Sequence, residues 1–165
     1  MKIELNTLDK ILKNFLTSYL IVLTIGVSIG LAFVNQTTRM TPDGAVERFN
    51  GSQETFEDDF EIRENYAKSF SEMLMTTHNH IIGFSFIFFT TGLIFYFNSI
   101  VKGFWKTFLL IEPFFSIILS FGSIWGMRFV HDGFVYITVI SATLMYISFF
   151  TMAGISIYEL KFKKN

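Results

Sequence analysis

Four long apolar segments constrain the fold of this chain more than any other feature of its sequence. They cover residues 15–34, 73–98, 107–127 and 134–157. About 20 apolar residues span a hydrocarbon core of roughly 30 Å as a helix, because a helix pairs its backbone polar groups internally. The composition agrees, since 51% of the 165 residues are hydrophobic. We therefore expect an all-α integral membrane protein, a four-helix transmembrane bundle.

The distribution of lysine predicts the orientation of the bundle. Lysines precede the first segment, fill the turn between the second and third, and follow the fourth: Lys2, Lys10, Lys13, Lys102, Lys106, Lys161, Lys163 and Lys164. Short segments rich in Lys and Arg stay in the cytoplasm. Both termini are therefore expected to be cytoplasmic, in what we take to be a bacterial inner membrane. The predicted connecting parts are an interfacial amphipathic segment at 1–14, an acidic extracytoplasmic loop at 35–72, a cytoplasmic turn at 99–106, an extracytoplasmic turn at 128–133 and a cytoplasmic tail at 158–165.

Local patterns refine two of these connections. Apolar residues recur at helical spacing before the first span, which predicts a short interfacial helix: Leu5, Leu8, Ile11, Leu12 and Phe15. In the outer loop, Pro42-Asp43-Gly44 has the side chains of a tight turn. The acidic Glu57-Asp58-Asp59 is expected to be solvated, and the part from Ile62 onward to be helical.

The three histidines of the chain all lie on the predicted outer side. His78 and His80 open the second span, and His131 lies in the last turn. Positions two apart on a helix point roughly 200° from each other, so on a regular helix only one of the first two faces the bundle. We expect His80 and His131 to hold haem b or a metal, with His78 as a substitute ligand. The alternatives are side chains wetted at the interface, or a proton-linked or quinone-contacting role.

Charged neighbours fit such a site. Asp132 can accept a hydrogen bond from the far nitrogen of a ligating histidine, and Arg128 can neutralise a carboxylate or a haem propionate. Small residues gather in the same leaflet, at Gly26-x-x-x-Gly30, Gly122-x-x-x-Gly126 and Gly83. Such residues let either a neighbouring helix or a flat cofactor approach the backbone closely.

Glu112 and Pro113 form a polar defect in the third span. A carboxylate in hydrocarbon is costly unless it is paired, wetted or protonated. A proline in a helix removes a backbone donor and often kinks the helix. Glu112 is therefore predicted to take part in a proton or ion step. The alternative is a salt bridge to the snorkelling Lys102 or Lys106.

Other functional classes find little support. The chain has no cysteine, which excludes thiolate metal sites and disulfides, and its net charge of -1 comes without a basic stripe for nucleic acid. No Walker, GxGxxG or Ser-His-Asp pattern occurs, so an autonomous enzyme is not expected.

The first functional hypothesis is an electron-transfer protein or respiratory-complex subunit. The others are a cofactor-free accessory or assembly subunit of a larger membrane complex, and a small proton-coupled carrier using Glu112. The expected partners are the lipid bilayer and either another membrane protein or further copies of the chain.

Overall fold

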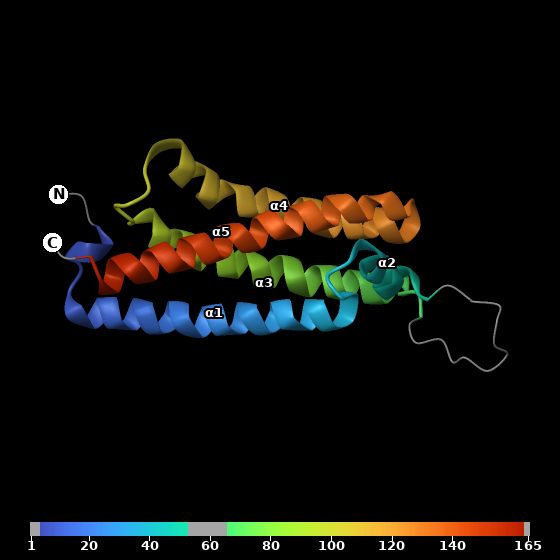
Figure 1. Cartoon of the computed structure of the whole chain (residues 1–165), viewed down its shortest axis with the longest axis horizontal. Helices are drawn as coiled ribbons and strands as arrows, with labels where there is room; N and C mark the ends of the chain where they lie inside the picture. Colours follow the sequence, from blue (N-terminus) through green and yellow to red (C-terminus); the bar gives the residue numbers. More distant parts are fainter. Residues whose placement is uncertain (1–3, 53–65, 164–165) are drawn as a thin grey trace.

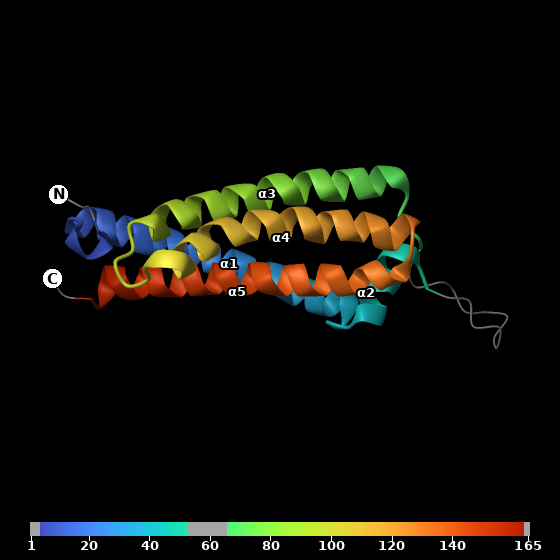
Figure 2. The ribbon, with the colours of Figure 1, turned by 90° about the horizontal axis from the view of Figure 1, so that it is seen from above.

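The computed structural model describes residues 4–52 and 66–163, and the regular structure in these residues is helical throughout. Four long helices lie side by side in an elongated bundle (Figures 1 and 2): α1 (Lys10–Thr38), α3 (Phe70–Tyr96), α4 (Gly103–Phe129) and α5 (Val135–Lys161). Each is long and apolar enough to cross a membrane. The prediction of an all-helical chain with four membrane-spanning helices is confirmed.

Side-chain caps fix where the first two long helices begin. The Asp9 carboxylate accepts hydrogen bonds from the backbone N–H groups of Ile11 and Leu12, at 2.9 and 3.0 Å, so α1 begins at Lys10. Ser69 and Glu72 form a reciprocal capping box at the start of α3. The prediction of a separate interfacial helix over 1–14 is wrong for the described part. Leu5–Thr7 form one 3-10 turn, η1, and the residues from Lys10 belong to α1.

The stretch predicted to be a tight turn is instead the start of a short helix, α2 (Pro42–Asn50). The Thr41 hydroxyl accepts a hydrogen bond from the Gly44 N–H at 3.0 Å, and Pro42 occupies the first turn. Threonine at the cap and proline directly after it are also the signature of a helix start. The residues 66–69 have no regular structure, and the acidic Glu57-Asp58-Asp59 lies outside the described residues.

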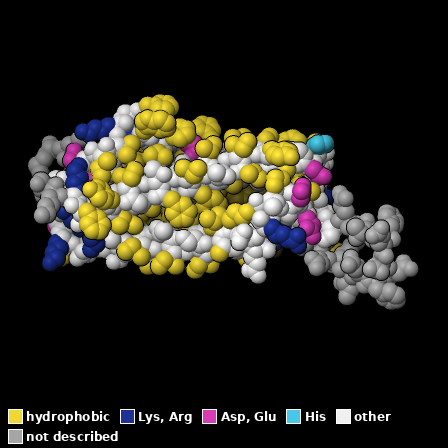
Figure 3. All heavy atoms as spheres, viewed as in Figure 1, with side chains coloured by type: hydrophobic (Ala, Val, Ile, Leu, Met, Phe, Trp, Pro, Cys, Tyr) yellow, Lys and Arg dark blue, Asp and Glu magenta, His cyan; other side chains and the backbone are white. Residues whose placement is uncertain are grey.

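The core of the bundle lies where α3, α4 and α5 pack together. Phe88 of α3 meets Phe149 of α5 edge to face, with ring centroids 6.2 Å apart. Ile117 of α4 and Met152 of α5 are buried beside them. Much of the outer surface is also apolar, and Figure 3 shows a band of hydrophobic side chains between the two charged ends. An apolar exterior of this kind suits contact with lipid.

The two ends of the bundle differ in charge. The lysine end contains both ends of the described chain and the α3–α4 connection, and lysine side chains gather there (Figures 1 and 3). The α2 end carries α2 and the short α4–α5 turn, which includes the 3-10 helix η2 (Asp132–Phe134). The helices thus bring lysines that are distant in sequence to one end, as the charge pattern implies.

Candidate functional site

A cavity of about 330 Å³ lies at the α2 end, between the four long helices. Its walls are mostly apolar, with aromatic and aliphatic side chains that include Phe33, Val34, Phe84, Phe121, Ile124 and Met145. Polar groups enter from several helices: Thr37, Thr76, His80, Ser120, Thr138 and Tyr146. Arg48 of α2 and Lys68 complete the lining with two positive charges. A mostly apolar cavity with a few polar groups is the usual form of a small-molecule site.

A second hollow of about 220 Å³ adjoins this cavity and shares Gly30, Phe84 and Tyr146 with it. It extends along α1 past Gly26 to Leu23. From Leu23 to Thr37, the lining of the two hollows follows α1 for about 21 Å at 1.5 Å per residue. We call the two hollows together the α1 groove.

The glycine motifs differ in what they contact. A β-carbon at Gly26 or Gly30 would meet no atom within 4 Å, so these glycines widen the α1 groove and do not bring helices into contact. Gly122 is open in the same way. At Gly126 a β-carbon would come within 2.6 Å of the Phe134 ring, so close packing applies there alone among these four.

The two cations of the α1 groove are positioned in different ways, Lys68 by hydrogen bonds of its backbone and Arg48 by contact with an aromatic ring. The Lys68 N–H donates to the Phe49 carbonyl at 2.9 Å, and the Arg128 Nε donates to the Lys68 carbonyl at 2.9 Å. The Arg48 guanidinium lies over the Phe33 ring, 5.1 Å from its centroid. Neither Arg48 nor Lys68 forms an ion pair with a carboxylate of the described residues.

Burial makes the positive charge of Arg48 less favourable. The side chain is half-buried, and desolvation lowers the pKa of its guanidinium. An anion placed beside this group would offset part of that cost. The cationic part of the α1 groove is therefore suited to a negatively charged group.

His80 is the one predicted histidine ligand that lines the α1 groove. Its Nδ1 lies 2.8 Å from the Thr76 carbonyl oxygen. A carbonyl only accepts, so Nδ1 carries a hydrogen in this contact, and it is Nε2 that has the lone pair whenever the ring is neutral. The ring packs against that of Phe121, with centroids 5.5 Å apart. Both His78 and His80 are exposed. They lie two positions apart on one regular helix, so their side chains point roughly 200° from each other.

His131 lies in a different hollow, which it lines with Asp132 and residues of α2. Its Nδ1 accepts a hydrogen bond from the Gly133 N–H at 2.9 Å and caps η2. The lone pair at Nδ1 is therefore engaged in this hydrogen bond. The Asp132 carboxylate accepts from the Asn50 amide at 2.7 Å, which ties α2 to the α4–α5 turn.

The structure thus keeps the predicted ligands apart. His80 and His131 line different hollows, and the Arg128 side chain bonds to a backbone carbonyl. No group of three or more His, Asp or Glu able to hold a metal ion occurs in residues 4–52 and 66–163. Binding of haem b or a metal by His78, His80 and His131 stays a prediction from the sequence.

Glu112 contacts hydroxyl groups on two helices. It hydrogen-bonds with Ser116 on its own helix, and the Ser148 hydroxyl of α5 donates to its Oε2 at 2.7 Å. Glu112 forms no ion pair with a described residue. The Lys106 ammonium donates to the Asn98 carbonyl at 2.7 Å, so the salt bridge considered from the sequence is not the arrangement found.

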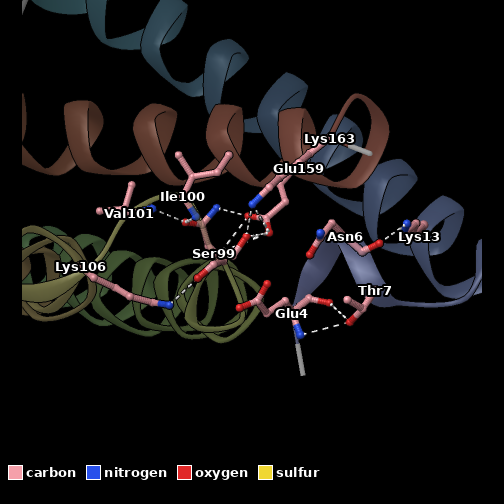
Figure 4. Close-up of polar contacts among 11 residues, drawn as sticks. Glu4, Asn6, Thr7, Lys13, Ser99, Ile100, Val101, Lys106, Glu159 and Lys163 are labelled. Carbon is pink, nitrogen blue, oxygen red and sulfur yellow. Dashed lines mark hydrogen bonds and ion pairs between the residues drawn. The ribbon is translucent and has the colours of Figure 1, made fainter. Parts of the chain in front are cut away.

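A second buried carboxylate, Glu159, was not singled out by the sequence reasoning. Its side chain is 0% exposed, and it accepts hydrogen bonds from the Asn98 amide at 2.5 Å and from the Ser99 N–H at 2.9 Å. Lys163 lies 3.9 Å from its Oε1. Figure 4 shows Glu159 of α5 and Lys163, which follows the end of α5, both meeting Ser99.

This network has a structural role, because it fastens the α3–α4 connection to the end of α5. The Asn98 Oδ1 also accepts from the N–H groups of Ile100 and Val101, at 2.9 and 2.7 Å. The signal in the sequence was a lone acid between apolar residues at the end of the fourth span, together with the Asn-Ser pair after the second.

Comparison with known proteins identifies a family. The model of the Aq_1264_TM family, described as a transmembrane helical domain, matches residues 39–165. This range begins directly after α1 and covers α2 to α5. Neither the comparison with curated proteins nor that with solved structures gives a match. The match covers most of the chain, and the protein therefore belongs to the Aq_1264_TM family of transmembrane helical domains.

Proposed function

We propose that this integral membrane protein binds an anionic phospholipid, with an acyl chain in the α1 groove and the phosphate beside Arg48 and Lys68. One observation carries the proposal: the α1 groove is apolar along the bundle and ends at two cations, neither of which forms an ion pair among the described residues, although the exposed Glu72 carboxylate lies near enough to Lys68 to interact with it electrostatically. Apolar walls favour the chain, and the two cations favour a negatively charged head.

The dimensions of the α1 groove support a lipid as the occupant. Half of a hydrocarbon core of roughly 30 Å is about 15 Å, so the groove is long enough for one lipid tail to lie along it within a leaflet. The open positions at Gly26 and Gly30 leave room beside α1 where a larger side chain would block the groove. The matched family range begins after α1, so the groove lies between the family domain and a helix outside that range.

Charge also indicates the side from which lipid enters. The lysine end is the one that the positive-inside rule places in the cytoplasm. The α1 groove would then open toward the outer leaflet of a bacterial inner membrane. Haem or a metal is a weaker candidate, because His80 is the only histidine in the groove lining within the described residues.

The experiment compares two lipids in the same bilayer. The protein is placed in nanodiscs of phosphatidylglycerol and phosphatidylcholine in equal amounts, extracted into mild detergent, and examined by native mass spectrometry. We expect retained phosphatidylglycerol. Replacing both cations, Arg48→Gln with Lys68→Gln, should remove the preference for this lipid. Gly30→Leu should reduce retention of both lipids, since the leucine side chain fills the α1 groove.

Matched controls use positions outside the groove lining. Arg39→Gln removes an exposed cation at the same end, and Gly154→Leu adds the same bulk at an open glycine of α5. Both variants should retain phosphatidylglycerol as the unmodified protein does. Equal retention of the two lipids by the unmodified protein would overturn the proposal. So would a second protein that occupies the groove in place of lipid, which would favour the accessory-subunit hypothesis.

A further inference from the structure

Glu112 lies deep in the membrane-spanning part of α4. It follows Gly103, the first residue of α4, by nine positions, and Ser116 at the helix midpoint lies four positions further on. At 1.5 Å per residue, Glu112 is about 14 Å from the start of α4 and about 6 Å from its middle. The residue is half-buried, so part of its side chain faces away from the bundle, where a bilayer presents hydrocarbon.

The groups around Glu112 supply hydroxyls and no positive charge. Its hydrogen-bond partners are Ser116 and Ser148. Lys106 lies on the same helix and donates to the Asn98 carbonyl. The helices packed against this half of α4 carry further titratable groups that have no hydrogen bond or ion pair with Glu112: Tyr96 on α3, and Tyr146, Tyr158, Glu159 and Lys161 on α5.

Two neutral hydroxyl donors do not offset the cost of placing a negative charge in hydrocarbon. A neutral acid avoids that cost and keeps both contacts, because one oxygen can accept from Ser148 while the other donates to Ser116. We propose that Glu112 is a proton-binding site within the bilayer, held in its neutral form by Ser116 and Ser148. The site is separate from the α1 groove and does not depend on lipid binding.

Infrared spectroscopy of the protein in lipid vesicles tests the state of the carboxyl. The spectrum of the Glu112→Gln variant is subtracted from that of the unmodified protein. The difference should contain the carbonyl stretch of a protonated acid, and Ser148→Ala should shift that band because one hydrogen bond is lost. Glu72→Gln, at an exposed capping acid of α3, is the matched control and should not remove the band. A difference made of carboxylate bands would overturn the proposal.

A second measurement needs no variant. Dicyclohexylcarbodiimide enters bilayers and reacts with protonated carboxyl groups. The acid proton moves to one nitrogen, the carboxyl oxygen bonds to the central carbon, and an acyl shift gives a stable N-acylurea with no leaving group. Peptide mass spectrometry should place the adduct on Glu112, because this half-buried residue can be reached from the bilayer. Adducts on exposed acids such as Glu72, with none on Glu112, would contradict the proposal.

Discussion

Gly44 lies directly against the carbonyl oxygen of Thr38, and a β-carbon at position 44 would come within 2.1 Å of that oxygen. This contact joins the end of α1 to the first turn of α2. Arg39 and Met40 lie between the two helices and both adopt left-handed conformations, with φ of 52° and 55°. The tight connection positions α2 and places Arg48 at the α1 groove.

Gly44→Ala should therefore destabilise the α2 end. The opposing atom belongs to the backbone and cannot move aside like a flexible side chain, so we expect a loss of about 1–3 kcal/mol, the usual cost of overpacking. Thermal unfolding in detergent, followed by circular dichroism, measures it as a Tm several degrees lower. Gly83→Ala is the control, since a β-carbon there meets nothing within 4 Å. Equal Tm values for the two variants would contradict this account of α2.

Glu159→Ala should destabilise the lysine end. The change leaves the buried Asn98 amide and the Ser99 N–H without their acceptor, and each buried donor left unpaired costs about 1–3 kcal/mol. Glu159→Gln retains an acceptor oxygen and should cost less. Lys163→Gln removes a partly exposed ion pair and the hydrogen bond to the Ser99 hydroxyl but leaves both acceptor oxygens of Glu159 in place, so it should cost less than Glu159→Ala. Chemical unfolding of the three variants ranks their free energies of unfolding. If Glu159→Ala is as stable as Lys163→Gln, the structural role given to Glu159 is refuted.

The sequence predicts the four spans well because the length of an apolar run is a local property. It is less reliable at α2. Thr41 and Pro42 fit the start of either a turn or a helix, and the outcome here includes the contact of Gly44 with Thr38, which local patterns do not contain. The short α2 then carries Arg48 to the α1 groove, although in the sequence this residue is one charge among many in an acidic loop.

For the site residues, too, the sequence does not contain the long-range contacts that decide which side chains meet. Residue type drew attention to the histidines, but their distance depends on how α3 and the α4–α5 turn are placed, and the structure puts His80 and His131 in different hollows. The partners of Glu159 are about sixty positions earlier in the chain. Only the folded arrangement brings Asn98 and Glu159 together.

Two substitutions of His131 separate capping from metal ligation. His131→Ala removes the acceptor for the Gly133 N–H and should cost about 0.5–2 kcal/mol, the usual range for a lost cap. Asn also accepts at cap positions but is a poor metal ligand, so His131→Asn should restore most of the stability. Unfolding and metal analysis are measured on the same samples. If both variants lose bound metal and lose stability equally, His131 acts as a ligand and the capping explanation fails.

Tyr146→Phe should weaken lipid retention without weakening the fold. The ring lines both hollows of the α1 groove, and the hydroxyl has no hydrogen-bond partner in the described residues. Removing it therefore breaks no internal bond, whereas a bound lipid would lose the hydrogen bond from this hydroxyl to an ester oxygen between its head and its tail, worth about 0.5–1.5 kcal/mol, or roughly 2- to 12-fold in affinity. Titration with phosphatidylglycerol in detergent measures the change, and Tyr158→Phe at the lysine end serves as the control. A lower Tm with unchanged lipid affinity would instead make Tyr146 a packing residue of α5.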